Sequence, residues 1–157
     1  CNMALPAQFT ALSGEWKGTK SLYLNGESGP VRESASRLTI ARAARGCYLM
    51  LAYTWKFEAD PHEGILLLGY DDSQQAATAA WGDSWHMSRK IMHCDGTIID
   101  GKTLSVTGHY AAPPDPDWGW RITLTIDTAH SIALVMHNIS PAGQEDLAVR
   151  ALFARTG

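Results

Sequence analysis

The side chains that could carry out nucleophilic or acid–base chemistry are few and widely spaced. Ser84 and His86 lie two residues apart, as a nucleophile and its base would on one face of a strand. The residues around Ser84 do not resemble the strand-to-helix turn that exposes the nucleophile of many hydrolases. The sequence also gives no carboxylate that can be assigned to orient the histidine. We therefore interpret both as surface residues and predict no catalytic residue.

Metal-ligating residue types come closest together at His86, His93 and Cys94, with Asp95 beside them. On an extended strand the two histidines lie about 20 Å apart and on opposite faces. Zinc ligands must converge to about 2.0 to 2.3 Å from one ion. The spacing therefore predicts no metal site.

Length and composition restrict the remaining functions. The chain of 157 residues is 45% hydrophobic and 18% charged, which predicts one soluble domain over residues 1–157. Its 13 Lys and Arg against 16 Asp and Glu give a net charge of -3, so a nucleic-acid partner is not expected. The longest apolar run, from Ile65 to Tyr70, is far shorter than the ~20 residues of a membrane-spanning helix, and no membrane span is predicted.

Cysteine usage bears on the compartment. Cys1, Cys47 and Cys94 are too few and too scattered for a disulfide framework, and their odd number leaves at least one thiol free. This favours a reducing environment, so we predict a cytoplasmic protein. The alternative is an exported lipoprotein, because the mature chain of a lipoprotein begins with cysteine as this one does.

The pattern of apolar and turn-forming residues predicts one short helix followed by strands alone. Apolar residues three or four apart indicate the helix, over residues 6–13. From about 14 to 156 the chain divides into runs of β-branched and aromatic residues punctuated by Gly, Pro, Asn and Asp. The predicted strands are 15–24, 33–43, 47–57, 64–71, 76–83, 85–93, 103–111, 118–127, 131–139 and 146–155.

Turn chemistry and strand number together predict the fold. Asn25-Gly26, Asp95-Gly96 and Asp100-Gly101 are typical of tight hairpin turns. Three prolines within 111–117 lack a backbone donor, so that stretch is predicted to be an exposed connection outside any ladder. Ten antiparallel strands would leave two open edges, and closing the sheet removes both. We predict an all-β, single antiparallel up-and-down β-barrel, with a β-sandwich as the alternative.

Alternation along the strands predicts which side chains face the interior. On the fifth and sixth strands, Trp81, Asp83, Trp85, Met87 and Arg89 share one parity. On the others the inward sets are Leu49, Leu51, Tyr53, Trp55 and Phe57; Leu104, Val106, Gly108 and Tyr110; Trp118, Trp120, Ile122, Leu124 and Ile126; Ile132, Leu134, Met136 and Asn138; and Leu147, Val149, Ala151 and Phe153.

Such an interior is aromatic, has few polar groups, and suits one small apolar or amphipathic molecule. The alternative is that the rings fill the barrel and leave no cavity. A slip of one residue in register would instead bring His109, Arg121 or His137 inside and favour a carboxylate. The predicted ligand-binding residues are Tyr53, Trp55, Trp81, Asp83, Trp85, Arg89, Tyr110, Trp120, Met136 and Asn138.

Gly14-Glu15-Trp16, at the start of the first strand, resembles the Gly-x-Trp signature of the calycin superfamily, which includes lipocalins and fatty-acid-binding proteins. With the segments given below, the chain resembles a family of uncharacterised, mostly bacterial, lipocalin-like proteins classed as a domain of unknown function. The resemblance implies a calycin-like barrel in which Arg155 of the last strand packs on Trp16. The further segments are Leu68-Gly69-Tyr70-Asp71, Ala80-Trp81-Gly82-Asp83-Ser84, Leu104-Ser105-Val106-Thr107-Gly108-His109-Tyr110, Ser140-Pro141-Ala142-Gly143-Gln144-Glu145 and Phe153-Ala154-Arg155.

The resemblance supplies no established reaction or ligand, and we predict no cofactor. Haem-binding relatives with such a barrel ligate iron through a histidine on a late strand. The last predicted strand, 146–155, contains no histidine, and His137 on the strand before it is predicted to face outward.

Three functions follow from these observations. The leading hypothesis is a non-enzymatic protein that binds one small, partly apolar molecule inside the barrel. The second is an enzyme acting at the barrel mouth through His109 and Asp83 or another carboxylate, such as Asp115 or Asp117. The third is an interaction module that forms a homodimer through outward apolar residues of the fourth and fifth strands. The residues predicted for that contact are Leu66, Leu68, Ala77 and Ala79.

Overall fold

The computed structural model describes residues 5–157, so the prediction for Cys1 lies outside the described residues. A short helix, α1 (Ala7–Thr10), precedes ten strands, and a 3-10 turn, η1 (Ala44–Gly46), joins the second to the third. Among residues 5–157, no helix has the length and apolar content needed to cross a bilayer. The strands are β1 (Gly14–Glu27), β2 (Val31–Ala43), β3 (Tyr48–Phe57), β4 (Asp60–Asp71), β5 (Ala76–Asp83), β6 (Met92–Ile99), β7 (Thr103–Ala112), β8 (Asp115–Thr128), β9 (Ser131–Ile139) and β10 (Glu145–Arg155).

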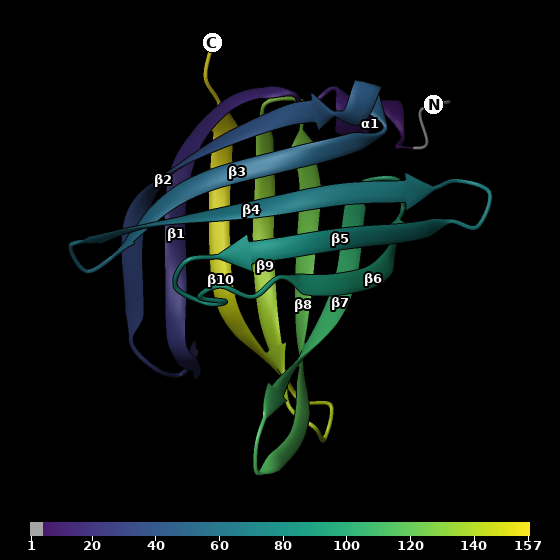
Figure 1. The fold of residues 1–157 in the computed structure, drawn as a ribbon. Coiled ribbons are helices and arrows are strands. Elements are labelled where there is room, and N and C mark those ends of the chain that lie inside the picture. Colours follow the sequence, from purple (N-terminus) through teal and green to yellow (C-terminus); the bar gives the residue numbers. More distant parts are fainter. Residues whose placement is uncertain (1–4) are drawn as a thin grey trace.

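The strands form one closed sheet (Figure 1). Each strand pairs antiparallel with its sequence neighbours, and β1 pairs with β10, which joins the first strand to the last. Closure leaves no strand at a sheet edge, as expected for ten strands in one small domain. The prediction of an all-β antiparallel barrel with a short N-terminal helix is confirmed, and the β-sandwich is excluded.

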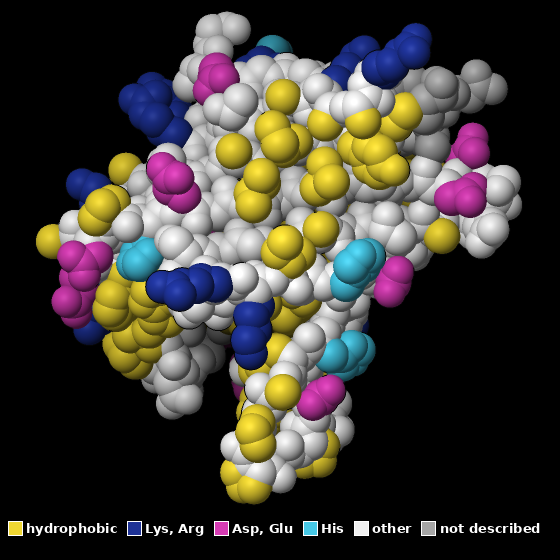
Figure 2. All heavy atoms as spheres, in the orientation of Figure 1, with side chains coloured by type: hydrophobic (Ala, Val, Ile, Leu, Met, Phe, Trp, Pro, Cys, Tyr) yellow, Lys and Arg dark blue, Asp and Glu magenta, His cyan; other side chains and the backbone are white. Residues whose placement is uncertain are grey.

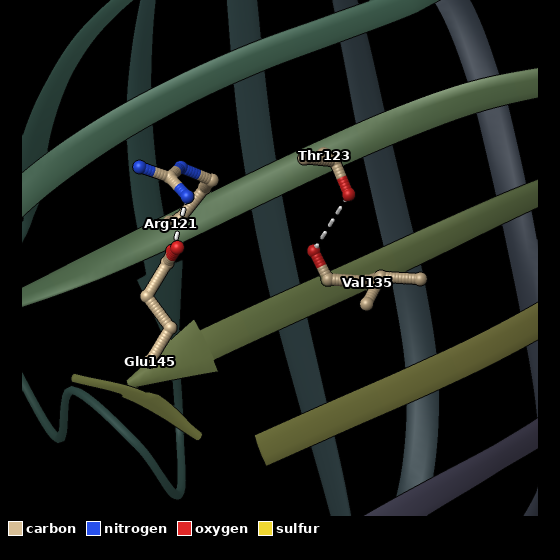
Figure 3. A network of polar contacts seen from close by, with 4 residues as sticks. All are labelled: Arg121, Thr123, Val135 and Glu145. Carbon is tan, nitrogen blue, oxygen red and sulfur yellow. Dashed lines mark hydrogen bonds and ion pairs between the residues drawn. The ribbon is translucent and has the colours of Figure 1, made fainter. Parts of the chain in front are cut away.

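The inward faces predicted for β3 and for β7 to β10 are also confirmed, because their central residues are buried. On β8, Ile122 is buried whereas Arg121 and Thr123 face outward. There Arg121 pairs with Glu145, and Thr123 Oγ1 donates to the carbonyl of Val135 (Figure 3). The one-residue slip that would place Arg121 inside does not occur.

The helix α1 lies over one end of the barrel and buries Phe9 and Leu12. It is shorter than the predicted 6–13. The N–H groups of Leu12 and Ser13 each bond to a carbonyl three residues back, as in a 3-10 turn, so the α-helical ladder stops before them.

The contact between the first and last strands is present as predicted. Trp16 and Arg155 are register partners, and the guanidinium carbon lies 4.4 Å from the centroid of the indole. The same guanidinium donates to the carbonyls of Ser13 (3.0 Å) and Ala11 (2.8 Å). A cation on a ring face with two carbonyl acceptors holds the helix, β1 and β10 together.

One predicted strand is wrong. Residues 85–93 were expected to form the sixth strand, but β6 begins only at Met92, and the segment before it is a series of turns. The cause is Asp83, whose Oδ1 accepts the N–H groups of Trp85 (2.9 Å) and His86 (3.0 Å). These bonds bend the chain away from an extended path immediately after β5.

The turn prediction is confirmed at Asp100-Gly101 and not at the other two places. Asp100 and Gly101 have φ of 53° and 66° in the reversal between β6 and β7. Asn25-Gly26 lies within β1, and the chain reverses just after it, where the Gly29 N–H bonds back to the carbonyl of Gly26. Asp95-Gly96 lies inside β6. Gly96 serves close strand approach there, because a Cβ would lie 1.8 Å from a backbone oxygen of β7.

The proline-rich stretch 111–117 is exposed as predicted, but most of it belongs to strands. β7 continues to Ala112, β8 begins at Asp115, and these two residues pair with each other. Pro116 falls at the irregularity in this ladder, where no regular backbone donor is required. The result is the long β7–β8 hairpin that extends beyond the barrel in Figure 1.

The prediction of outward apolar residues on β4 and β5 is wrong. Leu66, Leu68, Ala77 and Ala79 are all buried, since they share the inward parity of Trp81. The outward apolar side chains of β4 and β5 lie at the positions between these buried residues.

Candidate functional site

The barrel wall is open between β6 and β7 at the end opposite α1. These strands pair only from Asp95 with Thr107 to Ile99 with Thr103, although β7 continues along β8 as far as Ala112. A cavity of about 770 Å³ occupies the gap. Its lining residues are Trp81, Trp85, His86, Met87, Ser88, Lys90, Ile91, Met92, His93, His109, Tyr110, Ala111 and Trp120.

The inner wall of this cavity depends on Gly108. A Cβ at that position would lie 2.6 Å from Met92 Cγ and 2.8 Å from Cys94 Sγ, so only glycine admits both side chains. Cys94 is free and buried, which confirms the predicted unpaired thiol, and burial raises its pKa to about 11. Cys94 therefore stays a neutral packing residue at neutral pH.

Asp83 organises the floor of the site. Its Oδ1 caps the turn described above, and its Oδ2 accepts from Tyr53 Oη at 2.7 Å and Trp55 Nε1 at 3.2 Å. Burial by itself raises the pKa of Asp83, but the charges that His86 and Lys20 can carry and the hydrogen bonds outweigh burial and lower it. The carboxylate is thus ionised and holds both oxygens in fixed hydrogen bonds.

Tyr53 extends this network. Its Oη donates to Asp83 and accepts from Trp81 Nε1 at 3.0 Å. Burial, and then the charge of Asp83, raise the pKa of Tyr53 well above its ordinary value, so the phenol remains protonated. The predicted residues Tyr53, Trp55, Trp81 and Asp83 therefore do come together, as one hydrogen-bonded unit.

Lys20 lies inside the barrel beside this unit, although its side chain is charged. The residue is 2% exposed, and its Nζ lies 3.3 Å from the centroid of the Trp55 ring. Burial lowers the pKa of Lys20 to about 7, and only the charge of Asp83 acts in the opposite direction. The indole of Trp55 thus contacts the amine with its face and the carboxylate with its N–H.

Lys20 Nζ and Ser36 Oγ, two buried polar atoms near β1, have no hydrogen-bond partner among residues 5–157. Both side chains are buried, and the sequence interpretation did not identify either as a site residue. The signal for Lys20 was present, because it shares the parity of Trp16 and Leu22 on β1. A lysine at an inward position is the kind of local conflict that marks a functional or strained site.

His86 is placed by the turn after Asp83 among four indoles. Its ring centroid is 4.7 Å from that of Trp85, 5.3 Å from that of Trp120, and 5.7 Å from those of Trp55 and Trp81. Burial, and then the charge of Lys20, lower the pKa of His86 to about 3, so the imidazole is neutral. The prediction that His86 is a surface residue is therefore wrong, since the turn directs it inward.

Two polar atoms at the junction of two cavities lack partners. His86 Nε2 and Trp120 Nε1 are buried without a hydrogen bond. Both residues line the 770 Å³ cavity and also a second one of about 290 Å³. That second cavity is lined by Leu22, Tyr23, Leu24, Asn25, Gly26, Trp85, His86, Trp118, Trp120, Asn138, Asp146, Leu147 and Ala148.

The predicted ligand-binding residues divide into three groups. Trp81, Trp85, Tyr110 and Trp120 line the larger cavity, and Asn138, whose Oδ1 accepts from Tyr110 Oη at 2.6 Å, lines the smaller one. The next three pack in the core and line neither cavity. They are Tyr53, Trp55 and Met136.

The two remaining predicted residues lie apart from both cavity walls. Asp83 is buried beneath the site, and Arg89 is exposed in the turn segment. Arg89 was predicted on an extended strand, and the turns after Asp83 alter that parity.

The candidate catalytic pairs are arranged differently from their order in the sequence. Ser84 Oγ lies 2.9 Å from His62 Nδ1, on the exposed surface, and makes no side-chain hydrogen bond with His86. His109 is an exposed residue on the cavity wall, whereas Asp83 is buried and receives its hydrogen bonds from other residues.

Comparison with known proteins agrees with this architecture. No curated protein matches the chain significantly. Among solved structures, the chain is similar to the crystal structure of Rv2717c from M. tuberculosis, with a TM-score of 0.68, 13% sequence identity and coverage of 98% of this chain and 99% of that one. At this identity the similarity concerns the fold alone. A family model matches residues 6–155, and the chain therefore belongs to the family described as "Protein of unknown function (DUF1579)".

Proposed function

We propose that the protein binds one small, partly apolar molecule in the cavity between β6 and β7. The observation that carries this proposal is the cavity itself, about 770 Å³ in volume and walled by Trp81, Trp85, Tyr110 and Trp120. Ligand sites commonly have volumes of about 300 to 1,000 Å³, aromatic walls and a few polar groups that orient the guest. The resemblance to calycins, whose barrels enclose small molecules, supports the same role.

The polar groups of the cavity favour an amphipathic guest with a hydrogen-bond acceptor. Trp120 Nε1 is an unpaired donor at the inner wall, and neutral His86 can also donate through Nε2. Lys90 lines the cavity, whereas none of the Asp and Glu residues in the described part of the chain does. A guest with an acceptor or an acidic group would meet these donors while its apolar part contacts the indoles.

Tryptophan fluorescence tests the proposal, because three indoles line the cavity. Titration with 8-anilinonaphthalene-1-sulfonate and with the neutral N-phenyl-1-naphthylamine is expected to quench this fluorescence in a saturable manner. Ala111→Phe places a ring in the cavity and is expected to weaken binding about tenfold or more, equivalent to about 1.4 kcal/mol. The matched control is Ala154→Phe, at an exposed position near the C-terminal end of β10 that does not line the cavity.

Equal binding by Ala111→Phe and Ala154→Phe would place the probes elsewhere and contradict the proposal. Absence of saturable binding of both probes to the unmodified protein would also contradict it. If the neutral probe binds more weakly than the sulfonate, the hydrogen-bond donors of the cavity contribute to binding, because the two probes share one apolar ring system and differ in the acidic group.

A further inference from the structure

The outer face of β2 to β5 carries apolar side chains in register. One cross-strand row runs through Ala41, Met50, Leu67 and Ala80, and the adjacent row runs through Thr39, Ala52, Ile65 and Gly82. On β2 to β5 neither row contains a charged residue, and Glu15 of β1 borders the second row, where its Oε2 accepts from Thr39 Oγ1 at 2.8 Å. Figure 2 shows hydrophobic side chains gathered over this part of the molecule, in the upper half of the view. We call these eight residues the apolar wall.

The largest residues of the apolar wall are unusually open to solvent. Ile65 is 47% exposed, and Met50 and Leu67 are each 36% exposed. Isolated exposed apolar residues are ordinary, but contiguous ones are typical of surfaces that contact another protein.

The apolar wall is asymmetric about β3. On β4 its residues are the large Ile65 and Leu67, whereas the register positions on β2 are the small Thr39 and Ala41. β3 lies between them and carries Met50 at the centre. The large side chains of β4 and the small side chains of β2 therefore lie at equal distances on the two sides of β3.

Opposite charges occupy the same two flanks in the next row. Arg37 on β2 and Glu63 on β4 stand on either side of Thr54 of β3, and both are exposed. Within residues 5–157, the one ion pair is Arg121 with Glu145, so neither Arg37 nor Glu63 is paired in its own chain. One strand, β3, lies between them, and the two strand spacings put their backbones about 10 Å apart.

We propose that the apolar wall docks against a second copy of this chain, about a two-fold axis that runs along β3. Such an axis exchanges the flanks, so that β4 of one copy faces β2 of the other. Ile65 and Leu67 would then lie over Thr39 and Ala41 of the second copy, and Met50 would meet its own equivalent. Because the axis is two-fold, each of these contacts between a large and a small residue occurs twice in the dimer.

The same axis also matches the charges. Arg37 of each copy faces Glu63 of the other, which gives two ion pairs at one margin of the contact. A two-fold axis across the strands would instead place Arg37 opposite uncharged positions of β2. Lys56 lies on β3 beyond this margin, where its long side chain can keep the ammonium in water. The charge pattern therefore selects the axis along β3.

Charge reversal gives a test that depends on this axis. By sedimentation equilibrium, the unmodified protein is expected to be a dimer. Arg37→Glu and Glu63→Arg should each raise the dissociation constant about tenfold or more, because each creates two like-charge contacts. An equimolar mixture of the two variants should form a heterodimer, since each variant then faces its opposite charge at both positions.

Controls separate the contact from folding and from net charge. Arg150→Glu makes the same charge change at an exposed position on β10 and should leave the dimer unchanged. Ile65→Glu should abolish the dimer, and circular dichroism should show that every variant keeps its strands. A monomeric unmodified protein, a dimer that survives Ile65→Glu, or variants that fail to associate on mixing would each overturn the proposal. This inference is independent of ligand binding, which concerns the opposite side of β6.

Discussion

Asp83 is the residue whose substitution should affect the site most. Asp83→Asn replaces one of its two carboxylate oxygens by an amide nitrogen. The carboxylate accepts four hydrogen bonds, from Tyr53 Oη and Trp55 Nε1 on Oδ2 and from the N–H groups of Trp85 and His86 on Oδ1. An amide has one accepting oxygen, and its nitrogen can only donate. Whichever way the amide is turned, two of the four donors lose their acceptor.

The expected cost follows from that count. A buried donor left without a partner costs about 1 to 3 kcal/mol, so two of them lower the free energy of unfolding by about 2 to 6 kcal/mol. The lost negative charge also removes the interaction that raises the pKa of Lys20. Lys20 would then be neutral at pH 7, which limits the additional cost of its burial.

Urea unfolding followed by tryptophan fluorescence measures this change, with an unchanged dependence on urea as the sign of an intact two-state transition. Asp127→Asn is the matched control at an exposed position and should change the free energy of unfolding by less than about 0.5 kcal/mol. If Asp83→Asn prevents folding, Tyr53→Phe removes one of the four donors and should cost about 1 to 3 kcal/mol. A change below about 1 kcal/mol for Asp83→Asn would refute the view that this carboxylate organises the turn.

Two further predictions concern buried charge and the barrel seam. Burial lowers the pKa of Lys20 from 10.5 to about 7 and that of His86 from 6.5 to about 3. Between the folded and unfolded pKa of each group, the folded protein therefore binds fewer protons than the unfolded chain. Within that pH range, the free energy of unfolding should rise by up to about 1.4 kcal/mol per pH unit for each group. Urea unfolding at about pH 7.5 and 9.5 should show this rise, and Lys20→Met should remove it; an equal rise in that variant would contradict the assignment. Arg155→Met should lower the free energy of unfolding by about 1 to 3 kcal/mol, because it removes carbonyl hydrogen bonds and the contact with Trp16, whereas exposed Arg150→Met should have little effect.

Much of the barrel follows from local patterns. Regular alternation on β3 and on β7 to β10 correctly identified the inward side chains, because a pleated strand with one buried face must alternate. Asp100-Gly101 identified its hairpin for the same kind of local reason, since both residues accept positive φ.

The site itself was predicted only in part. Alternation predicts Trp81, Trp85, Tyr110 and Trp120 as lining residues, and they do line the larger cavity. His86 was missed, because the parity rule assumes an extended chain and Asp83 ends that extension with its side chain. A hydrogen bond from a side chain to the following backbone competes with a strand, and composition alone does not decide the outcome.

The sequence by itself determined an all-β fold with its main inward faces, because hydrophobic alternation is a property of each strand. The tertiary structure decided what those faces meet. Only the pairing of β1 with β2 and of β2 with β3 places Lys20 near the ring of Trp55, and only the early end of the β6–β7 pairing opens a cavity. These relations depend on residues distant in the chain, and on where a strand pairing ends, which no local pattern encodes.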